Sequence, residues 1–322
     1  MKYRKLGASG IEVSEIGYGA WGIGGAQWGG ADDDRSIEAL HRAIDLGLNF
    51  IDTALAYGEG RSERLVGQVV RERPETIHVA TKVPPKNLTW PAPDGVPVED
   101  VFPADHVRAC AERSLSNLGL ERIDLLQFHV WSDEWADRGD WREAVDELRS
   151  EGKIGSFGVS INDHQPANAL RVIESGAVDT VQVIYNVFDQ SPEDQLFPAC
   201  REHGVGVIAR VPLDEGGLTG AIGPDTEFGE GDFRAHYFRD DRPREVQGRV
   251  RAIASDLGIA EDALAEIALR FILSEPTVST VIPGMRSPRN VERNVAVSDG
   301  RGVPDAWREK LRAHRWVRNF YR

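Results

Sequence analysis

The sequence predicts an α/β protein, a (β/α)8 TIM barrel that uses residues 1–322 as one domain. Short apolar runs alternate with longer segments in which apolar residues recur three and four positions apart, the patterns of buried strands and amphipathic helices. This alternation repeats eight times with no low-complexity linker. It requires parallel strands joined by helical crossovers, and barrels of this kind use about 200 to 400 residues as one domain.

The elements follow in order along the chain. A β-hairpin is expected first, because YRKLGASGIEVSEIG places two short β-type runs around a turn at residues 7–10. The eight strands are expected at residues 15–19, 48–52, 77–82, 123–129, 155–160, 180–185, 205–210 and 280–283. The ring helices are expected at residues 36–47, 62–72, 105–119, 140–152, 165–176, 192–204, 243–258, 261–274 and 287–295, with an extra C-terminal helix at 304–315.

An open doubly wound sheet is the structural alternative. Such a sheet normally carries a short glycine-rich phosphate loop between its first strand and its first helix. Here the first strand leads into GYGAWGIGGAQWGG, which contains glycines but continues well beyond a short loop before a helix begins. The sequence therefore favours a closed barrel.

Three connections depart from the usual short length, at residues 83–103, 130–140 and 213–242. Long loops in a compact domain are usually functional, and the first two follow strands at their C-terminal ends, where barrel enzymes build active sites. The first loop is rich in proline, which restricts the backbone, so we expect it to be stiff. The alternative for each loop is a tolerated surface insertion.

The composition excludes several classes of partner. The chain has 38 Lys and Arg against 52 Asp and Glu, a formal net charge of −14, whereas nucleic acid and anionic membranes require a basic surface. Its two cysteines, Cys110 and Cys200, are too few for a disulfide framework or a thiolate metal site. No signal peptide or membrane helix is visible. We expect a cytoplasmic monomer or homo-oligomer that acts on a small molecule.

Polar side chains end three of the predicted strands. Asp52 ends NFID, Lys82 ends HVATK and His129 ends IDLLQFH, while Tyr57 follows Asp52 in the same loop. The C-terminal ends of barrel strands meet around one axis, so these four side chains are expected to converge.

Together the four residues suit the reduction of a carbonyl group. A tyrosine releases its proton reluctantly near neutral pH, but an ammonium group nearby stabilises the phenolate, so we expect Lys82 to lower the pKa of Tyr57. Asp52 would hold Lys82 in place, and His129 would donate a hydrogen bond to the carbonyl oxygen. Taken singly, Asp52 could be a capping residue, Tyr57 a half-buried aromatic and His129 a core residue. Their joint occurrence at neighbouring strand ends favours chemistry.

The sequence resembles the aldo-keto reductase family. The resemblance is carried by LGASGIEVSEIGYGAWGIGG, NFIDTALAYGEGRSERLVG, VATK, RSLSNLGLERIDLLQFH, GKIGSFGVS, VQVIYNVFD, PLDEGGLTG and VIPGMRSPRNVERNV, in the family's order and over nearly the whole chain. It places the family's catalytic tetrad on Asp52, Tyr57, Lys82 and His129. It also implies direct hydride transfer from a nicotinamide cofactor, without a metal.

The resemblance also assigns cofactor-binding residues. They are Gly19, Ala20 and Trp21 at the nicotinamide end, Ser160 and Gln182 on the carboxamide, and Arg210, Pro212, Leu213, Gly217, Leu218, Gly284, Arg286, Asn290 and Asn294 along the rest of the dinucleotide. Two positions depart from the family. Family members often carry asparagine directly after Ser160, where this chain has Ile161 followed by Asn162. Arg210 stands where the family has an aromatic residue, and a guanidinium plane can also stack on a ring.

We expect NADPH as the cofactor. Arg286 and Arg289 lie at the start of the last ring helix, and arginines at a helix N-terminus suit a phosphate monoester. Gly284 replaces a lysine found in many relatives, and a solvated basic turn is the alternative. The candidate substrate residues are aromatic, foremost Trp28, Trp90 and Trp131, with Trp135, Tyr237 and Phe238 near the same loops. Aromatic walls suit an aldehyde, ketone or sugar-derived carbonyl; several of these rings are expected to anchor loops instead.

Two other functions stay open. One is a non-catalytic barrel that binds NADPH as a redox sensor or as a subunit of an assembly, which the presence of all four residue types disfavours. The other is a metal-dependent barrel hydrolase, which needs His, Asp or Glu ligands at strand ends. The first strand, SEIGYGAWG, carries no histidine. The basic, aromatic tail HRWVRNFYR could fold over the barrel mouth or pack elsewhere.

Overall fold

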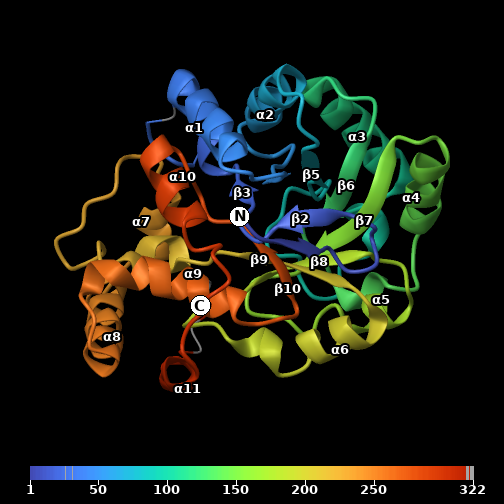
Figure 1. The fold of residues 1–322 in the computed structure, drawn as a ribbon. Coiled ribbons are helices and arrows are strands. Elements are labelled where there is room, and N and C mark those ends of the chain that lie inside the picture. Colours follow the sequence, from blue (N-terminus) through green and yellow to red (C-terminus); the bar gives the residue numbers. More distant parts are fainter. Residues whose placement is uncertain (26, 31, 317–318, 320–322) are drawn as a thin grey trace.

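The chain forms a (β/α)8 barrel in the computed structural model, which describes residues 1–25, 27–30, 32–316 and 319 (Figure 1). Its eight strands are all parallel and lie in the order of the sequence. They are β3 (Tyr18–Gly19), β4 (Phe50–Asp52), β5 (His78–Val83), β6 (Ile123–Phe128), β7 (Ile154–Ser160), β8 (Thr180–Ile184), β9 (Gly206–Arg210) and β10 (Val278–Val281).

Backbone bridges close the sheet between its first and last strands. Ile16 pairs with Val281 and Gly19 pairs with Gly284, both in parallel register. The amide of Gly19 donates to the carbonyl of Pro283 at 3.1 Å. The sheet is therefore a closed barrel, as predicted, and the open alternative is wrong.

Helices surround the barrel on its outer side (Figure 1). They are α1 (Asp33–Asp45), α2 (Arg61–Glu72), α3 (Ala104–Leu118), α4 (Trp141–Ser150), α5 (Leu170–Glu174), α6 (Leu196–His203), α7 (Phe233–Tyr237), α8 (Arg242–Leu257), α9 (Leu264–Leu273), α10 (Pro288–Val295) and α11 (Asp305–Ala313). Short 3-10 turns complete the connections: η1 (Gly22–Gly24), η2 (Val98–Asp100), η3 (Asp133–Trp135), η4 (Ser191–Glu193), η5 (Asp214–Thr219) and η6 (Glu261–Ala263). No described helix is both long and apolar enough to cross a bilayer.

The N-terminal hairpin plugs one end of the barrel. Its strands, β1 (Tyr3–Lys5) and β2 (Glu12–Ser14), lie across the barrel in Figure 1. Leu6 and Val13 pack into a buried cluster with residues from the barrel strands, namely Phe50, Ala80, Leu125, Ile208 and Ile282. Arg4 donates to the carbonyl of Val278, the first residue of β10, at 2.8 Å. Since the N-terminal ends of the strands are covered, a site can open only at their C-terminal ends.

Two predicted helices are shorter than expected. The segment 165–176 is helical only over α5, and the segment 192–204 divides into η4 and α6. Pro198 accounts for the second difference. Proline has no N–H to donate, so it is tolerated in the first turn of a helix but not in its interior, and α6 begins two residues before it.

The C-terminal tail packs against the loop after β8 and against α8. Trp316 meets the ring of Phe188 edge-on at 5.4 Å, and its backbone amide donates to the Phe188 carbonyl at 2.9 Å. Residues 317–318 and 320–322, which complete the segment expected to fold over the mouth or pack elsewhere, lie outside the described residues.

The contact between α2 and α3 depends on a glycine, which leads to a stability prediction. A Cβ added at Gly67 would lie 2.1 Å from the Leu118 carbonyl oxygen, so the two helix backbones approach too closely for a larger residue. We expect G67A to lower the free energy of unfolding by about 1–3 kcal/mol, the usual cost of overpacking. Urea unfolding followed by circular dichroism measures this change.

The matched control for G67A is G248A on α8. Gly248 is exposed, and an added Cβ there meets nothing within 4 Å. Alanine is favoured over glycine in a helix interior by about 0.5–1 kcal/mol, so G248A should stabilise the fold slightly. Equal effects of the two substitutions would contradict the close approach of α2 to α3.

Candidate active site

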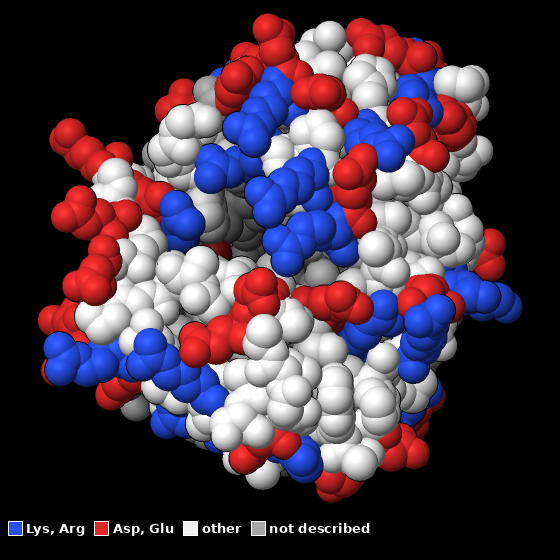
Figure 2. Space-filling view, turned by 60° about the vertical axis from the view of Figure 1, so that its left-hand side comes forward, with Lys and Arg blue, Asp and Glu red and all other residues white. Residues whose placement is uncertain are grey.

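A cavity of about 670 Å³ opens at the C-terminal ends of the strands. Its lining includes Asp52, Tyr57 and His129, together with residues that follow β3, β7, β9 and β10. Figure 2 shows a hollow on the face that carries α1, α7 and α10, with Lys and Arg side chains gathered beside it. Two of the cavity's own arginines are Arg234 and Arg286. The cavity therefore joins the predicted proton-transfer residues to a basic rim.

The Lys82 ammonium lies buried at the centre of this group. It donates to Asp52 Oδ1 at 2.5 Å, to the Thr53 carbonyl at 2.8 Å and to the Tyr57 hydroxyl at 3.3 Å. An ammonium has three N–H groups and accepts none, so these three partners use its full capacity. Because Lys82 donates to the Tyr57 oxygen, the phenolic O–H itself is free to point to another acceptor.

Two glutamines hold the second oxygen of Asp52. Gln182 Nε2 donates to Oδ2 at 2.7 Å, and Gln127 Nε2 donates to the same oxygen at 3.2 Å. Both glutamines are almost fully buried. The Asp52 carboxylate is therefore fixed on both sides, which in turn fixes the position of Lys82.

Burial raises the pKa of Tyr57 above its usual value, and the Lys82 ammonium opposes this shift. The net direction is upward, so the expected lowering of this pKa is wrong for the groups of the chain itself. Desolvation of the phenolate outweighs the nearby positive charge. The consequence favours proton donation, because Tyr57 stays protonated at neutral pH. Burial alone would lower the pKa of Lys82, but Asp52 and Tyr57 raise it overall, so the ammonium stays charged.

His129 is neutral in this environment. Burial lowers its pKa well below the usual value, and the positive charges of Lys82 and Arg210 act in the same direction. No hydrogen-bond partner lies at its buried Nδ1 among the described residues. A buried N–H without an acceptor is rarer than an acceptor without a donor, which favours the tautomer with the proton on Nε2. His129 meets the Tyr57 ring edge-on at 5.6 Å.

Most of the predicted cofactor residues line the same cavity. These are Gly19, Ala20, Trp21, Ser160, Gln182, Arg210, Pro212, Leu213, Gly284, Arg286 and Asn290. The other three are not among the described lining residues. Gly217 and Leu218 are buried in η5, and Asn294 is buried on α10.

Arg210 binds two groups that the sequence analysis did not identify. Its guanidinium forms an ion pair with Asp163 and donates to the Ile161 carbonyl at 2.9 Å. The next residue, Val211, has a φ of 52°, which a β-branched residue rarely adopts. Strained backbone of this kind collects at functional sites, so the loop after β9 shares this property of binding loops.

The aromatic residues divide into two groups. Trp28 and Trp90 line the cavity, and their contact with a substrate stays a prediction. Trp131 does not, because its side chain is fully buried and packs against Phe128, Trp135 and Trp141 with ring centroids 5.4–6.3 Å apart. The assignment of Trp131 to the substrate is therefore corrected: its ring anchors the loop after β6.

Several lining or supporting residues were missed. Gln127 had a visible signal, because it lies two positions before His129 in an apolar strand and alternate residues of a strand share a face. Asp163 lies in the loop after β7, and Glu215, Phe233 and Arg234 lie within residues 213–242, which were expected to form a loop. In these segments the sequence shows no periodicity that would tell which side chain faces the cavity.

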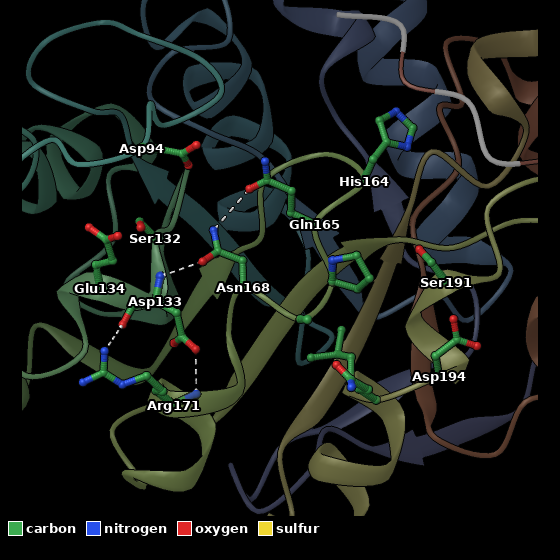
Figure 3. Close-up of a pocket in the computed structure, with 14 residues that line it drawn as sticks. Asp94, Ser132, Asp133, Glu134, His164, Gln165, Asn168, Arg171, Ser191 and Asp194 are labelled. Carbon is green, nitrogen blue, oxygen red and sulfur yellow. Dashed lines mark hydrogen bonds between the residues drawn. The ribbon is translucent and has the colours of Figure 1, made fainter. Parts of the chain in front are cut away.

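A second hollow of about 850 Å³ lies between the loops after β6, β7 and β8 (Figure 3). Its polar groups stabilise turns. Asp133 accepts from the backbone amides of Arg171 and Val172 at 2.8 and 3.1 Å, and Asn168 accepts from the Asp133 amide at 2.8 Å. These contacts show that Asp133 and Asn168 hold the backbone of neighbouring loops.

No group of three or more His, Cys, Asp and Glu side chains in the described residues could hold a metal ion. The metal-dependent hydrolase considered from the sequence therefore finds no ligand set in that part of the chain. The polar groups that converge here are suited to proton transfer.

Comparisons with known proteins agree with this fold. The sequence model of the Aldo/keto reductase family matches residues 15–308. The chain is 31% identical over 301 residues to the Aldo-keto reductase YhdN of Bacillus subtilis (strain 168), with 91% of this chain and 87% of that protein covered. It is 29% identical over 310 residues to the NADH-specific methylglyoxal reductase of Escherichia coli (strain K12), with 92% and 93% covered.

A solved structure is similar over the same length. The glycerol dehydrogenase AKR11B4 from Gluconobacter oxydans matches with a TM-score of 0.77 and 30% sequence identity. The match covers 97% of this chain and 94% of that chain. The likeness therefore extends over the whole barrel.

Glu215 provides a pH-dependent test of the cavity's electrostatics. Burial and the carboxylates of Asp214 and Asp163 raise the pKa of Glu215 from 4.5 to about 8, against the opposing charges of Arg210 and Arg234. Between these two values the folded protein keeps a proton that the unfolded chain releases, so the free energy of unfolding falls as pH rises.

We expect E215Q to remove this pH dependence. It should stabilise the protein at pH 9 more than at pH 5, by up to about 3 kcal/mol, since partial exposure of Glu215 screens part of the effect. Thermal unfolding at both pH values measures the difference. E227Q, on an exposed glutamate of the same loop, is the control and should change the two values equally. A pH-independent effect of E215Q would show that the pKa of Glu215 is not raised.

Proposed function

The chain belongs to the aldo/keto reductase family, and we propose from this premise that it is an NADPH-dependent oxidoreductase that interconverts a carbonyl compound and its alcohol. The substrate would be an aldehyde, a ketone or a sugar-derived carbonyl. The observation that carries the proposal is the hydrogen bond from the buried Lys82 ammonium to the Tyr57 hydroxyl, in the same cavity as His129.

The nicotinamide, when bound, would supply the hydride to the carbonyl carbon. Tyr57 acts as the general acid, because its O–H is not used by Lys82 and its raised pKa keeps the proton in place. As this proton passes to the carbonyl oxygen, the Lys82 ammonium stabilises the phenolate that is left. General acid catalysis of this kind contributes about 10²–10⁴ in rate. In the oxidative direction the same phenolate accepts the proton.

His129 would orient and polarise the substrate. As a neutral imidazole with its proton on Nε2, it donates a hydrogen bond to the carbonyl oxygen without adding a second positive charge beside Lys82. Asp52 acts indirectly, because it holds the ammonium within reach of Tyr57.

The residues of the cavity fit a nicotinamide dinucleotide. Gln182 uses its amide N–H groups toward Asp52 and Gln127, which leaves its Oε1 to accept from the carboxamide, with Ser160 beside it. At the other end, the guanidinium groups of Arg234 and Arg286 lie 4.7 and 5.5 Å from the Trp28 ring. Arg234 forms an ion pair with Asp232 at 2.6 Å, so the positive charge that favours an anionic ligand at this end comes mainly from Arg286.

The choice of NADPH rests on Arg286 and Asn290 at the start of α10. Family membership does not decide this choice, because one of the similar proteins is named as NADH-specific. A guanidinium at a helix N-terminus provides the donors and positive charge that a 2′-phosphate requires.

The alternative is a barrel that binds NADPH without catalysis. The convergence of Asp52, Tyr57, Lys82 and His129 within hydrogen-bond or ring-contact distance favours catalysis. Cofactor binding alone would not require a proton donor and its ammonium partner.

Assays of a panel of aldehydes, ketones and sugars with NADPH test the function. Y57F and K82M should lower kcat by about 10²–10⁴, because the first loses the proton and the second loses the charge that stabilises the phenolate. The dissociation constant of NADPH should stay within about twofold, which fluorescence quenching measures. Y3F, the same change on the exposed hairpin tyrosine, is the control and should keep full activity.

Two results would contradict the proposal. Wild-type protein that binds NADPH but reduces no member of the panel would favour the non-catalytic barrel. Full activity of Y57F would remove Tyr57 from the reaction while leaving the fold and the family unaffected.

The cofactor preference has its own test. R286A should weaken NADPH binding by about ten- to a hundredfold, since a hydrogen bond to a charged group contributes about 1.5–3 kcal/mol, and should change NADH binding much less. R293A, on an exposed arginine of the same helix, is the matched control. An equal loss for both cofactors in R286A would assign Arg286 to a part of the dinucleotide that NADPH and NADH share.

A further inference from the structure

In this structure the side chain of Asn162 hydrogen-bonds to a neighbouring loop, a role that differs from cofactor binding. It is buried, with 4% of its surface exposed, and follows the C-terminal end of β7. Its Oδ1 accepts from the Ala92 amide at 3.2 Å, and its Nδ2 donates to the Ala92 carbonyl at 3.1 Å. The side chain thus pairs with both backbone groups of one residue, as a neighbouring strand would.

This pairing satisfies groups that would otherwise be costly. Ala92 is 6% exposed, and buried backbone N–H and C=O groups nearly always have partners. The second N–H of the Asn162 amide points to Gln165 Oε1 at 3.4 Å. Both donors of Asn162 are therefore directed at the protein, and neither remains for a carboxamide oxygen.

The segment that Asn162 holds includes Trp90, whose ring lies beside His129 at the cavity. The Trp90 ring meets the His129 ring edge-on at 5.8 Å and lines the cavity. It is also 40% exposed, although large aromatic side chains are usually well buried. The ring thus presents an uncovered apolar face at the point where a carbonyl would meet His129.

Other anchors of this loop lie farther along the chain. Trp135 Nε1 donates to the Val96 carbonyl at 2.7 Å, and Phe102 stacks on Phe128 at 4.0 Å. Among the described hydrogen bonds, those that hold residues 90–92 at the cavity are made by Asn162. Ala92 also packs in the core and the Trp90 ring contacts His129, so Asn162 supplies the polar part of the contacts that position Trp90.

We propose that Asn162 is a positioning residue for substrate specificity: by holding Ala92 it sets Trp90 against His129, where the Trp90 ring binds a flat apolar group attached to the substrate carbonyl. The substrate class is then an aromatic aldehyde or ketone. The nature of the ligand rests on the proposed function, whereas the hold on Ala92 does not.

Hydrogen exchange tests the hold without any turnover. In N162A the Ala92 amide loses its acceptor, and peptides that cover residues 88–97 should exchange about three- to tenfold faster, as expected for the loss of one hydrogen bond. Q165A removes the weaker partner of Asn162, an oxygen that also accepts from Asn168 Nδ2 at 3.3 Å, and leaves both bonds to Ala92 in place. It is the matched control, with exchange in residues 88–97 as in the wild type. Unchanged exchange in N162A would overturn the positioning role.

Kinetics then test specificity. With NADPH, W90A and N162A should each raise KM for benzaldehyde about three- to tenfold, since aromatic contacts of this kind contribute in that range. KM for a short aliphatic aldehyde and the dissociation constant of NADPH should change less than about twofold. The double variant should resemble W90A alone, because both substitutions remove one interaction. Independent, multiplying effects would separate Asn162 from Trp90 and contradict the proposal.

Three further outcomes are decisive. A loss of NADPH affinity in N162A as large as that in S160A would make Asn162 a cofactor ligand and overturn the proposal. If N162A does not fold, the test is N162D, which keeps the acceptor for the Ala92 amide but loses the donor to the Ala92 carbonyl. Exchange faster than in the wild type would support the hold, and unchanged exchange would overturn it. Absence of turnover in the wild type would contradict the proposed reaction, while the exchange experiment would still decide the role of Asn162.

Discussion

The ion pair between Lys82 and Asp52 is the constraint on which the site depends. Both side chains are nearly inaccessible to solvent, and removing one partner of such a pair typically costs about 3–5 kcal/mol because the other charge stays buried. Further hydrogen bonds offset the cost of burying these charges. A backbone carbonyl and a phenol accept from the ammonium, and two glutamine amides donate to the carboxylate. The same bonds fix the geometry that proton transfer needs.

The barrel provides the dry surroundings in which this pair is effective. The hairpin closes the N-terminal end, and the Pro-rich loop, the loop after β9 and the segment around Trp28 surround the opposite end. Exclusion of water acts in two directions. It strengthens the attraction within the pair, and it raises the pKa of Tyr57, so the phenol enters the reaction protonated.

The regular parts of the molecule could be predicted from the sequence, because periodicity identifies strands and the C-terminal ends of barrel strands lie at the mouth. Asp52, Lys82 and His129 were found in this way. Trp131 was misplaced and Asp163 was missed because both lie in loops, where only tertiary contacts decide whether a side chain faces the cavity or the core. The direction of the Tyr57 pKa was wrong because a sequence shows charges but not the extent of desolvation.

The closure of the barrel links binding to stability. In the described part of the chain, the first and last barrel strands are joined by the isolated bridges Ile16–Val281 and Gly19–Gly284. Gly19 and Gly284 also line the cavity. A molecule bound there would contact both Gly19 and Gly284 and would help to hold the first and last strands together. Since a ligand stabilises whatever form it binds, occupancy would protect the barrel at the place where its sheet is least continuous.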